Sequence, residues 1–130
     1  MMKVGVPRET WPGEQRVALI PSAIQPLKKA GLDVVVERDA GARAGFTSAA
    51  YEQAGAAVGS RDDVFSAADI LLQVRSTPPE PSRLRPGQTV IGFADPLGSP
   101  HAIETIAATG ASRARHRAQD LGSVCMVACR

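Results

Sequence analysis

The chain has 130 residues, of which 44% are hydrophobic and 22% are charged, and its formal net charge is +2. This composition is typical of a globular protein large enough to bury a core, and the small positive charge does not favour a nucleic-acid partner. The sequence contains no apolar run of about 18 residues or more, and its first residues, MMKVGVPRET, lack the pattern of a signal peptide, so we expect a cytoplasmic location.

Short apolar runs alternate with helical patterns as far as Gly110. Strands are predicted, in chain order, over residues 3–6, 32–37, 56–58, 69–74 and 88–93. Helices are predicted to begin at Ser22, at Thr47 or Ser48, at Ser60 and at Ser99, and to end at Gly31, at Gly55, near Ala67 and at Gly110. Strands separated by helices indicate parallel pairing and right-handed crossovers. We therefore expect a doubly wound α/β fold of the flavodoxin or Rossmann kind, with a mostly parallel sheet flanked by helices.

The sequence changes character after Gly110. Residues 111–130 are rich in Arg and offer no clear strand, so we divide the chain into a domain over 1–110 and a divergent tail over 111–130. The sheet is then expected to be incomplete at the C-terminus, with an unpaired edge. A fragment and a reading frame altered near Ala111 both explain such a tail. Cys125 and Cys129 lack a second ligand pair, and no metal site is predicted there.

Motifs of known chemistry are missing from the sequence. No G-x-G-x-x-G follows a predicted strand, and the loop with Gly41 and Gly45 is interpreted as a flexible connection. No H-E-x-x-H, G-x-S-x-G or P-loop occurs, and His101 and His116 are interpreted as surface residues. No catalytic residue is therefore predicted.

Polar side chains stand at the carboxyl ends of the predicted strands, where open parallel sheets bind ligands. Arg16 follows the first strand, Gln73 and Arg75 end the strand over 69–74, and Asp95 follows the strand over 88–93. These four residues are candidates for one pocket, in which an Arg fork would bind a carboxylate or a phosphate. Alternatively, they are polar residues where strands meet solvent, and Arg16 ties its own loop to the sheet.

Four collinear segments resemble the N-terminal domain shared by alanine dehydrogenase and the α subunit of proton-translocating NAD(P) transhydrogenase. They are KVGVPRETWPGEQRVALIP, VVVERDAGARAGFTSAAYEQAGAAV, ADILLQVR and GQTVIGFADPLGSP, and the similarity runs from Lys3 to Gly110. In alanine dehydrogenase, the family pattern is an Arg in E-x-R-V-A, a Lys in LLKV and a His after the strand that matches VIGF. Here the Arg is Arg16, the Lys position is Gln73, and the His position falls on or beside Asp95.

The resemblance is therefore greater to the transhydrogenase α subunit. It implies hydride transfer between NAD(H) and NADP(H), coupled to proton movement, in a component located peripherally at the inner face of the membrane. Its implied partners are a membrane subunit, an NADP-binding subunit and a second copy in a homodimer.

The match to the family's NAD-contacting segment is confined to the letters RAQ, which end at Gln119. Only Gln119 carries over as a cofactor-binding residue, and NAD is expected to be held mainly by a second domain that these residues do not contain. We therefore expect the chain alone to be inactive. The alternatives are an amino-acid dehydrogenase domain like that of alanine dehydrogenase, and a non-catalytic truncated product that packs against other subunits.

Overall fold

The computed structural model describes residues 2–75, 81–93, 101, 104, 108, 111–114 and 124–129. Its strands are β1 (Lys3–Val6), β2 (Asp33–Glu37), β3 (Ala57–Gly59), β4 (Ile70–Arg75), β5 (Thr89–Phe93), β6 (Ala111–Ala114) and β7 (Val124–Cys129). The α-helices whose two ends both lie within the described residues are α1 (Ile24–Lys29), α2 (Ser48–Gln53) and α3 (Arg61–Ala67). Three short 3-10 turns are η1 (Pro21–Ala23), η2 (Ala42–Ala44) and η3 (Pro81–Arg83).

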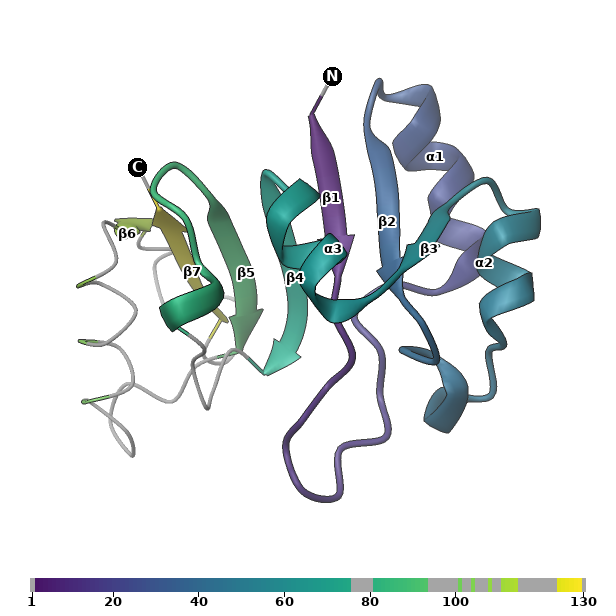
Figure 1. The fold of residues 1–130 in the computed structure, drawn as a ribbon, viewed down its shortest axis with the longest axis horizontal. Coiled ribbons are helices and arrows are strands. Elements are labelled where there is room, and N and C mark those ends of the chain that lie inside the picture. The colour runs from purple at the N-terminus through teal and green to yellow at the C-terminus, as the bar shows by residue number, and fades with distance from the viewer. Residues whose placement is uncertain are drawn as a thin grey trace.

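The first five strands form a parallel sheet in the order β3-β2-β1-β4-β5. The chain runs outward from β1 to β3 and then returns to the other side of β1 to form β4 (Figure 1). This is the order of the first five strands of a Rossmann fold, and the order in which successive strands are added reverses between β1 and β4. The predicted α/β class and mostly parallel sheet are confirmed.

The tail over 111–130 contains two strands, although the sequence analysis predicted none there. Strands β6 and β7 pair antiparallel with each other, and β7 pairs antiparallel with β5 from Thr89↔Ala128 to Phe93↔Val124. The prediction that the tail holds no strand is therefore wrong, and so is the prediction of an unpaired edge at β5. The reason is the segment VCMVAC, a run of six apolar residues that the Arg-rich composition of the whole tail hides.

Two of the predicted helix starts have the capping hydrogen bonds that the sequence predicts. The Thr47 side chain accepts from the Ala50 N–H at 3.2 Å, and Ser60 and Asp63 form a reciprocal capping box at the start of α3. The first helix differs, because Pro21 opens a 3-10 turn and Ser22 makes no side-chain cap. Most of the helix predicted from Ser99 to Gly110 lies outside the described residues, although residues 101, 104 and 108 are helical.

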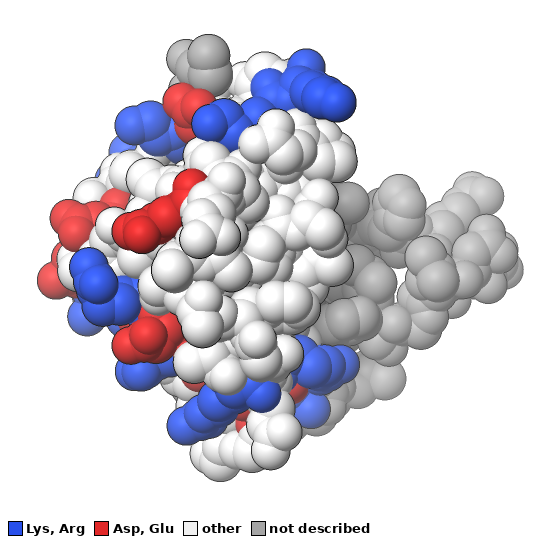
Figure 2. All heavy atoms as spheres, turned by 90° about the vertical axis from the view of Figure 1, so that its right-hand side faces the viewer, with Lys and Arg blue, Asp and Glu red and all other residues white. Residues whose placement is uncertain are grey.

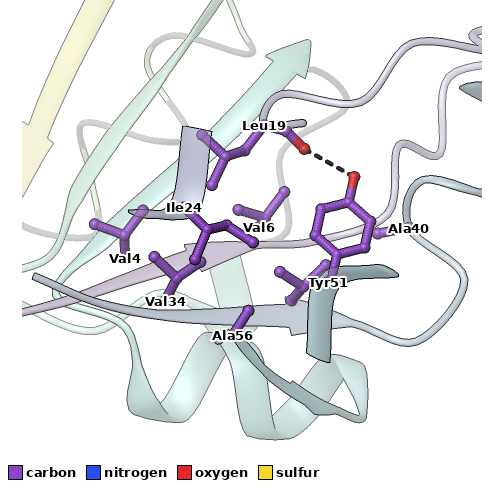
Figure 3. Close-up of a cluster of buried hydrophobic side chains, with 9 residues drawn as sticks. Val4, Val6, Leu19, Ile24, Val34, Ala40, Tyr51 and Ala56 are labelled. Carbon is purple, nitrogen blue, oxygen red and sulfur yellow. Dashed lines mark hydrogen bonds between the residues drawn. The ribbon is translucent and has the colours of Figure 1, made fainter. Parts of the chain in front are cut away.

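Helices α1 and α2 cover one face of the parallel sheet, and α3 covers the other (Figure 1). Between the sheet and the first pair of helices lies a cluster of buried side chains: Val4, Val6, Leu19, Ile24, Val34, Val36, Ala40, Tyr51 and Ala56. Within it the Tyr51 hydroxyl donates to the Leu19 carbonyl at 2.8 Å (Figure 3). Burial raises the pKa of Tyr51, so the hydroxyl remains a donor at neutral pH. This bond fastens the end of the loop after β1 to helix α2.

The surface over α1, α2 and β3 carries basic and acidic side chains that are interspersed around an uncharged area (Figure 2). Charges of both signs on one face keep the local potential low. No helix within the described part of the chain is long and apolar enough to cross a membrane.

Helix α3 approaches β1 so closely that Gly5 has no space for a side chain. A Cβ atom at Gly5 would lie 2.6 Å from the Cβ of Ala68 and 3.0 Å from a methyl carbon of Val64. Both neighbours are fully buried, with relative exposures of 0%, so neither has room to retreat.

Replacing Gly5 by Ala should therefore lower the free energy of unfolding by about 1–3 kcal/mol, the usual cost of overpacking a core. Urea denaturation followed by circular dichroism measures this difference. Lys3→Ala is the matched control on the same strand, because Lys3 is exposed, and it should change stability by less than about 0.5 kcal/mol. A Gly5→Ala protein as stable as the parent would show that α3 does not pack on β1 at this distance.

Candidate functional site

The candidate site lies where the strand order reverses, at the carboxyl ends of β1 and β4. The chain leaves β1 into the long loop of residues 7–20, which extends past the ends of the strands before α1 begins (Figure 1). Arg75 is the last residue of β4. Because open parallel sheets bind ligands at such a reversal, this loop and the end of β4 form the candidate site.

Glu14 is at the centre of the site. Its carboxylate accepts from Arg16 Nε at 2.8 Å and from Arg16 Nη2 at 2.8 Å, which makes a bidentate pair. Arg75 Nε approaches the same carboxylate at 3.3 Å and thereby connects the loop to β4. The Glu14 side chain is 6% exposed, whereas that of Arg16 is 62% exposed. The hydrogen bonds from Arg16 lower the pKa of Glu14 from 4.5 to about 2, so its carboxylate is ionised at neutral pH.

Glu9 fastens the first part of the loop to the same strand. Its two carboxylate oxygens accept from the backbone N–H groups of Val74 at 2.5 Å and Arg75 at 3.1 Å. Burial raises the pKa of Glu9, and the two N–H donors act in the opposite direction. The donors at the end of β4 are thus satisfied by a side chain of the protein itself.

Arg75 also contacts an aromatic ring. Its guanidinium carbon lies 4.8 Å from the centroid of the Trp11 ring, within the range of a cation–π interaction. Trp11 is 39% exposed and is the single tryptophan of the chain. Its fluorescence therefore reports on this site alone.

A cleft of about 100 Å³ opens beside these groups. Three basic and three acidic residues line it together with two alanines: Arg8, Arg16, Arg43, Glu9, Glu14, Asp39, Ala40 and Ala42. Pockets for drug-sized ligands have volumes of about 300–1,000 Å³, and one water occupies about 30 Å³ in the liquid. The cleft is therefore large enough for a few waters or one very small molecule, and its formal charges balance.

The structure brings two of the predicted pocket residues together. Arg16 and Arg75 share the Glu14 carboxylate, while Gln73 is half-buried on β4 and is not among the residues that line the cleft. Arg75 does not line the cleft either, and β4 has a register shift between these residues, since Leu72 pairs with Ile91 but Arg75 pairs with Phe93. The other two predicted site residues, Asp95 and Gln119, lie outside the described residues.

Glu9 and Glu14 are site residues that the sequence reasoning missed. Both occur in the segment RETWPGEQR, where each acidic residue lies within two positions of an arginine, Glu9 next to Arg8 and Glu14 near Arg16. That spacing is a signal of internal ion pairs, but it does not reveal that the two carboxylates are buried. Their burial depends on β4, which lies about 60 residues further along the chain.

The described residues do not fit a dinucleotide. In a Rossmann fold the pyrophosphate lies on a tight glycine-rich turn after the first strand, and an acidic residue after the second strand binds the ribose. Here the first strand is followed by the long loop 7–20, and Glu9 occupies the N–H donors at the reversal. Glu37, at the end of β2, is buried and accepts from Arg8 N at 2.7 Å and Arg61 Nη1 at 2.8 Å.

Metal chemistry finds no support in the same region. Within the described ranges, no group of three or more His, Cys, Asp or Glu side chains is placed to hold a metal ion.

Comparison with known proteins places these features in a family. The family described as "Alanine dehydrogenase/PNT, N-terminal domain" matches residues 5–115. The NAD(P) transhydrogenase subunit alpha of Cereibacter sphaeroides is 42% identical over 113 residues, which are 85% of this chain and 22% of that protein. The chain thus spans about a fifth of the length of this relative.

Two solved structures have the same fold. An L-alanine dehydrogenase superposes with a TM-score of 0.80 at 32% identity, over 87% of this chain and 32% of the other. The transhydrogenase from Sinorhizobium meliloti superposes with a TM-score of 0.79 at 38% identity, over 86% of this chain and 33% of the other.

The stability of the chain should depend on pH through Glu14. A carboxylate whose pKa is lower in the folded state stabilises the fold above its unfolded pKa, and this contribution is lost as the pH falls through the folded pKa. Glu14→Gln should thus lower the free energy of unfolding by about 1–2 kcal/mol at pH 7, a modest value because Arg16 is largely exposed. The difference from the parent should shrink as the pH falls from 4.5 towards 2.

Urea titrations of both proteins at several pH values between these limits and pH 7 measure the difference. Gln15→Ala is the control in the same loop, because Gln15 is exposed and uncharged. A difference between Glu14→Gln and the parent that stays constant at every pH would contradict the ion pairs seen here.

Proposed function

Because the chain belongs to the alanine dehydrogenase/PNT N-terminal domain family, we propose that it corresponds to this domain in the NAD(H)-binding α subunit of a proton-translocating NAD(P) transhydrogenase. Its role there is to support hydride transfer between NAD(H) and NADP(H). The family includes transhydrogenases and alanine dehydrogenases, and the homologues of both kinds are oxidoreductases.

The observation that carries this proposal is the identity of residue 73. By resemblance, an alanine dehydrogenase has a Lys here to hold the keto acid, and this chain has Gln73 on β4. A neutral amide cannot replace an ammonium group as the partner of a carboxylate. Asp95 in place of a His acts in the same direction, because an ordinary Asp is ionised at neutral pH and repels an anion.

The balance of charge around the cleft supports the same choice. The Arg16 guanidinium is paired with Glu14 through two hydrogen bonds, and this pair belongs to the E-x-R-V-A pattern common to both branches of the family. Because the charges that line the cleft also balance, no net positive potential attracts a keto acid.

A transhydrogenase needs no acid–base residue at this place. The hydride passes directly between two nicotinamides, and the protein has to hold the two rings close together and aligned. We propose that NAD(H) is held mainly by a second domain, with Gln119 as a contact from this chain. The partners in the proposal are a membrane subunit, an NADP-binding subunit and a second copy in a homodimer, at the inner face of the membrane.

The alternatives differ from this proposal in what they bind. An amino-acid dehydrogenase domain would take a small carboxylate into the cleft and support formation of NADH from alanine. A non-catalytic product would do neither and would act only by packing against other subunits.

A direct test exchanges this segment into a complete enzyme. Residues 5–115 replace the aligned segment of the Cereibacter sphaeroides α subunit, and hydride transfer is measured between NADPH and an NAD analogue. We expect a rate within about tenfold of the parent enzyme, which corresponds to about 1.4 kcal/mol in the barrier. In a second chimera, residues 5–115 replace the aligned segment of an alanine dehydrogenase. The proposal would be contradicted if the transhydrogenase chimera folds but is inactive while the alanine dehydrogenase chimera is active.

The isolated chain should bind NADH poorly, because the long loop 7–20 stands where a glycine-rich turn would bind the pyrophosphate, and Glu37, at the ribose position, is already bonded to Arg61. We expect a dissociation constant above about 1 mM, measured by NADH fluorescence on titration with the chain. The complete α subunit of a transhydrogenase is the positive control. A dissociation constant in the micromolar range for the isolated chain would contradict this expectation.

A further inference from the structure

We propose that the outer edge of strand β5 is an interaction surface for β5 of a second copy of this chain, and that β7 shields this edge by pairing with β5 in its own chain. The inference goes beyond the proposed function and does not depend on it. It assigns a role to the strand of the tail that the sequence analysis did not foresee, and it names the partner that the edge accepts when that strand is absent.

The first step is the direction of the backbone groups of β5. The Thr89 N–H donates to the carbonyl of the residue before β4 at 2.9 Å, so Thr89 faces β4. Successive residues of a strand direct their N–H and C=O groups alternately to the two sides. Val90 and Gly92 therefore direct theirs to the outer edge, where the register places Val90 opposite Val127 and Gly92 opposite Cys125.

The second step is the composition of β5, whose sequence is TVIGF. It contains no charged residue and no proline, and these are the features that protect natural sheet edges from association. The strands at the two ends of the described sheet are different, since β3 has three residues and β6 has four residues, one of which is Arg113. Short or charged edge strands resist pairing, whereas an uncovered β5 would lack both protections.

The third step is the symmetry of the edge. Two β5 strands related by a twofold axis would pair antiparallel about Ile91, with Val90 of one copy opposite Gly92 of the other. The outward N–H and C=O groups of both strands would then bond to each other. Because β7 pairs with the same two residues, β7 and a second copy compete for one set of backbone groups.

Strand β7 wins this competition because it belongs to the same chain. A tethered segment reaches an effective concentration of the order of 1 mM, so a second copy below that concentration is displaced. The match to the family covers residues 5–115, whereas β7 begins at Val124. The cover on β5 therefore comes from outside the part of the chain that matches the family.

The experiment opens the edge in the 130-residue chain by the double substitution Cys125→Pro and Val127→Pro. Proline removes the two N–H donors of β7 that face β5. In sedimentation velocity at about 0.1 mM, this variant should move to a dimer of the parent species, because the tethered competitor is lost. A variant that keeps a cooperative urea transition and sediments like the parent would overturn the proposal.

The matched control is Cys125→Val with Val127→Ile. It changes the same two positions to residues that favour strands and keeps both N–H groups, so it should sediment like the parent. A control that associates as strongly as the proline variant would show that the side chains, and not the pairing of β7 with β5, determine the association, and this would also overturn the proposal.

Hydrogen exchange of the Val90 and Gly92 N–H groups locates the contact. Both should be protected in the parent by β7, and in the proline variant they should be protected in the dimer and exposed on dilution to the monomer. Unprotected groups in the parent, or in the associated variant, would overturn the proposal. If the double variant does not fold, Val127→Pro alone is measured against the same outcomes, because it removes one of the two donors.

Discussion

Two carboxylates fix the architecture of this domain's carboxyl edge. Glu9 and Glu14 belong to the loop after β1, and both bind groups at the end of β4, the neighbouring strand at which the sheet reverses its direction. Without them the loop 7–20 would be a long solvated connection, and the N–H groups of Val74 and Arg75 would need other acceptors. The position of Arg16, the stacking of Trp11 and the shape of the cleft all follow from this attachment.

The attachment also satisfies polar groups at the strand ends of this Rossmann-like sheet with side chains of the protein itself. In a dinucleotide-binding Rossmann fold, the pyrophosphate lies on a glycine-rich turn after the first strand, and an acidic residue after the second strand binds the ribose. In this chain a long loop follows β1, Glu9 satisfies the N–H donors at the end of β4, and Arg61 together with the Arg8 N–H satisfies Glu37 at the end of β2. One fold can support different roles, and here the strand ends of the sheet stabilise a loop.

Local signals predict most of the fold, but contacts between distant segments decide the site. Thr47 and Ser60 are caps that the sequence reveals, because a cap depends on residues within one turn. Ser22 fails as a cap because the neighbouring Pro21 opens a different turn. Arg16 and Arg75 stand out as charged residues at strand ends, yet their common partner Glu14 does not, because its burial requires β4 to be in place.

The loop 7–20 is held at several points, among them Arg8 at Glu37, Glu9 and Glu14 at the end of β4, and the Leu19 carbonyl at Tyr51. Surface loops ordinarily tolerate insertions and deletions. Here an inserted residue would change the spacing between the contact residues of the loop. A carboxylate that now reaches the end of β4 would then no longer lie opposite its partner. The number of residues in this loop is therefore as much a part of the site as their chemistry.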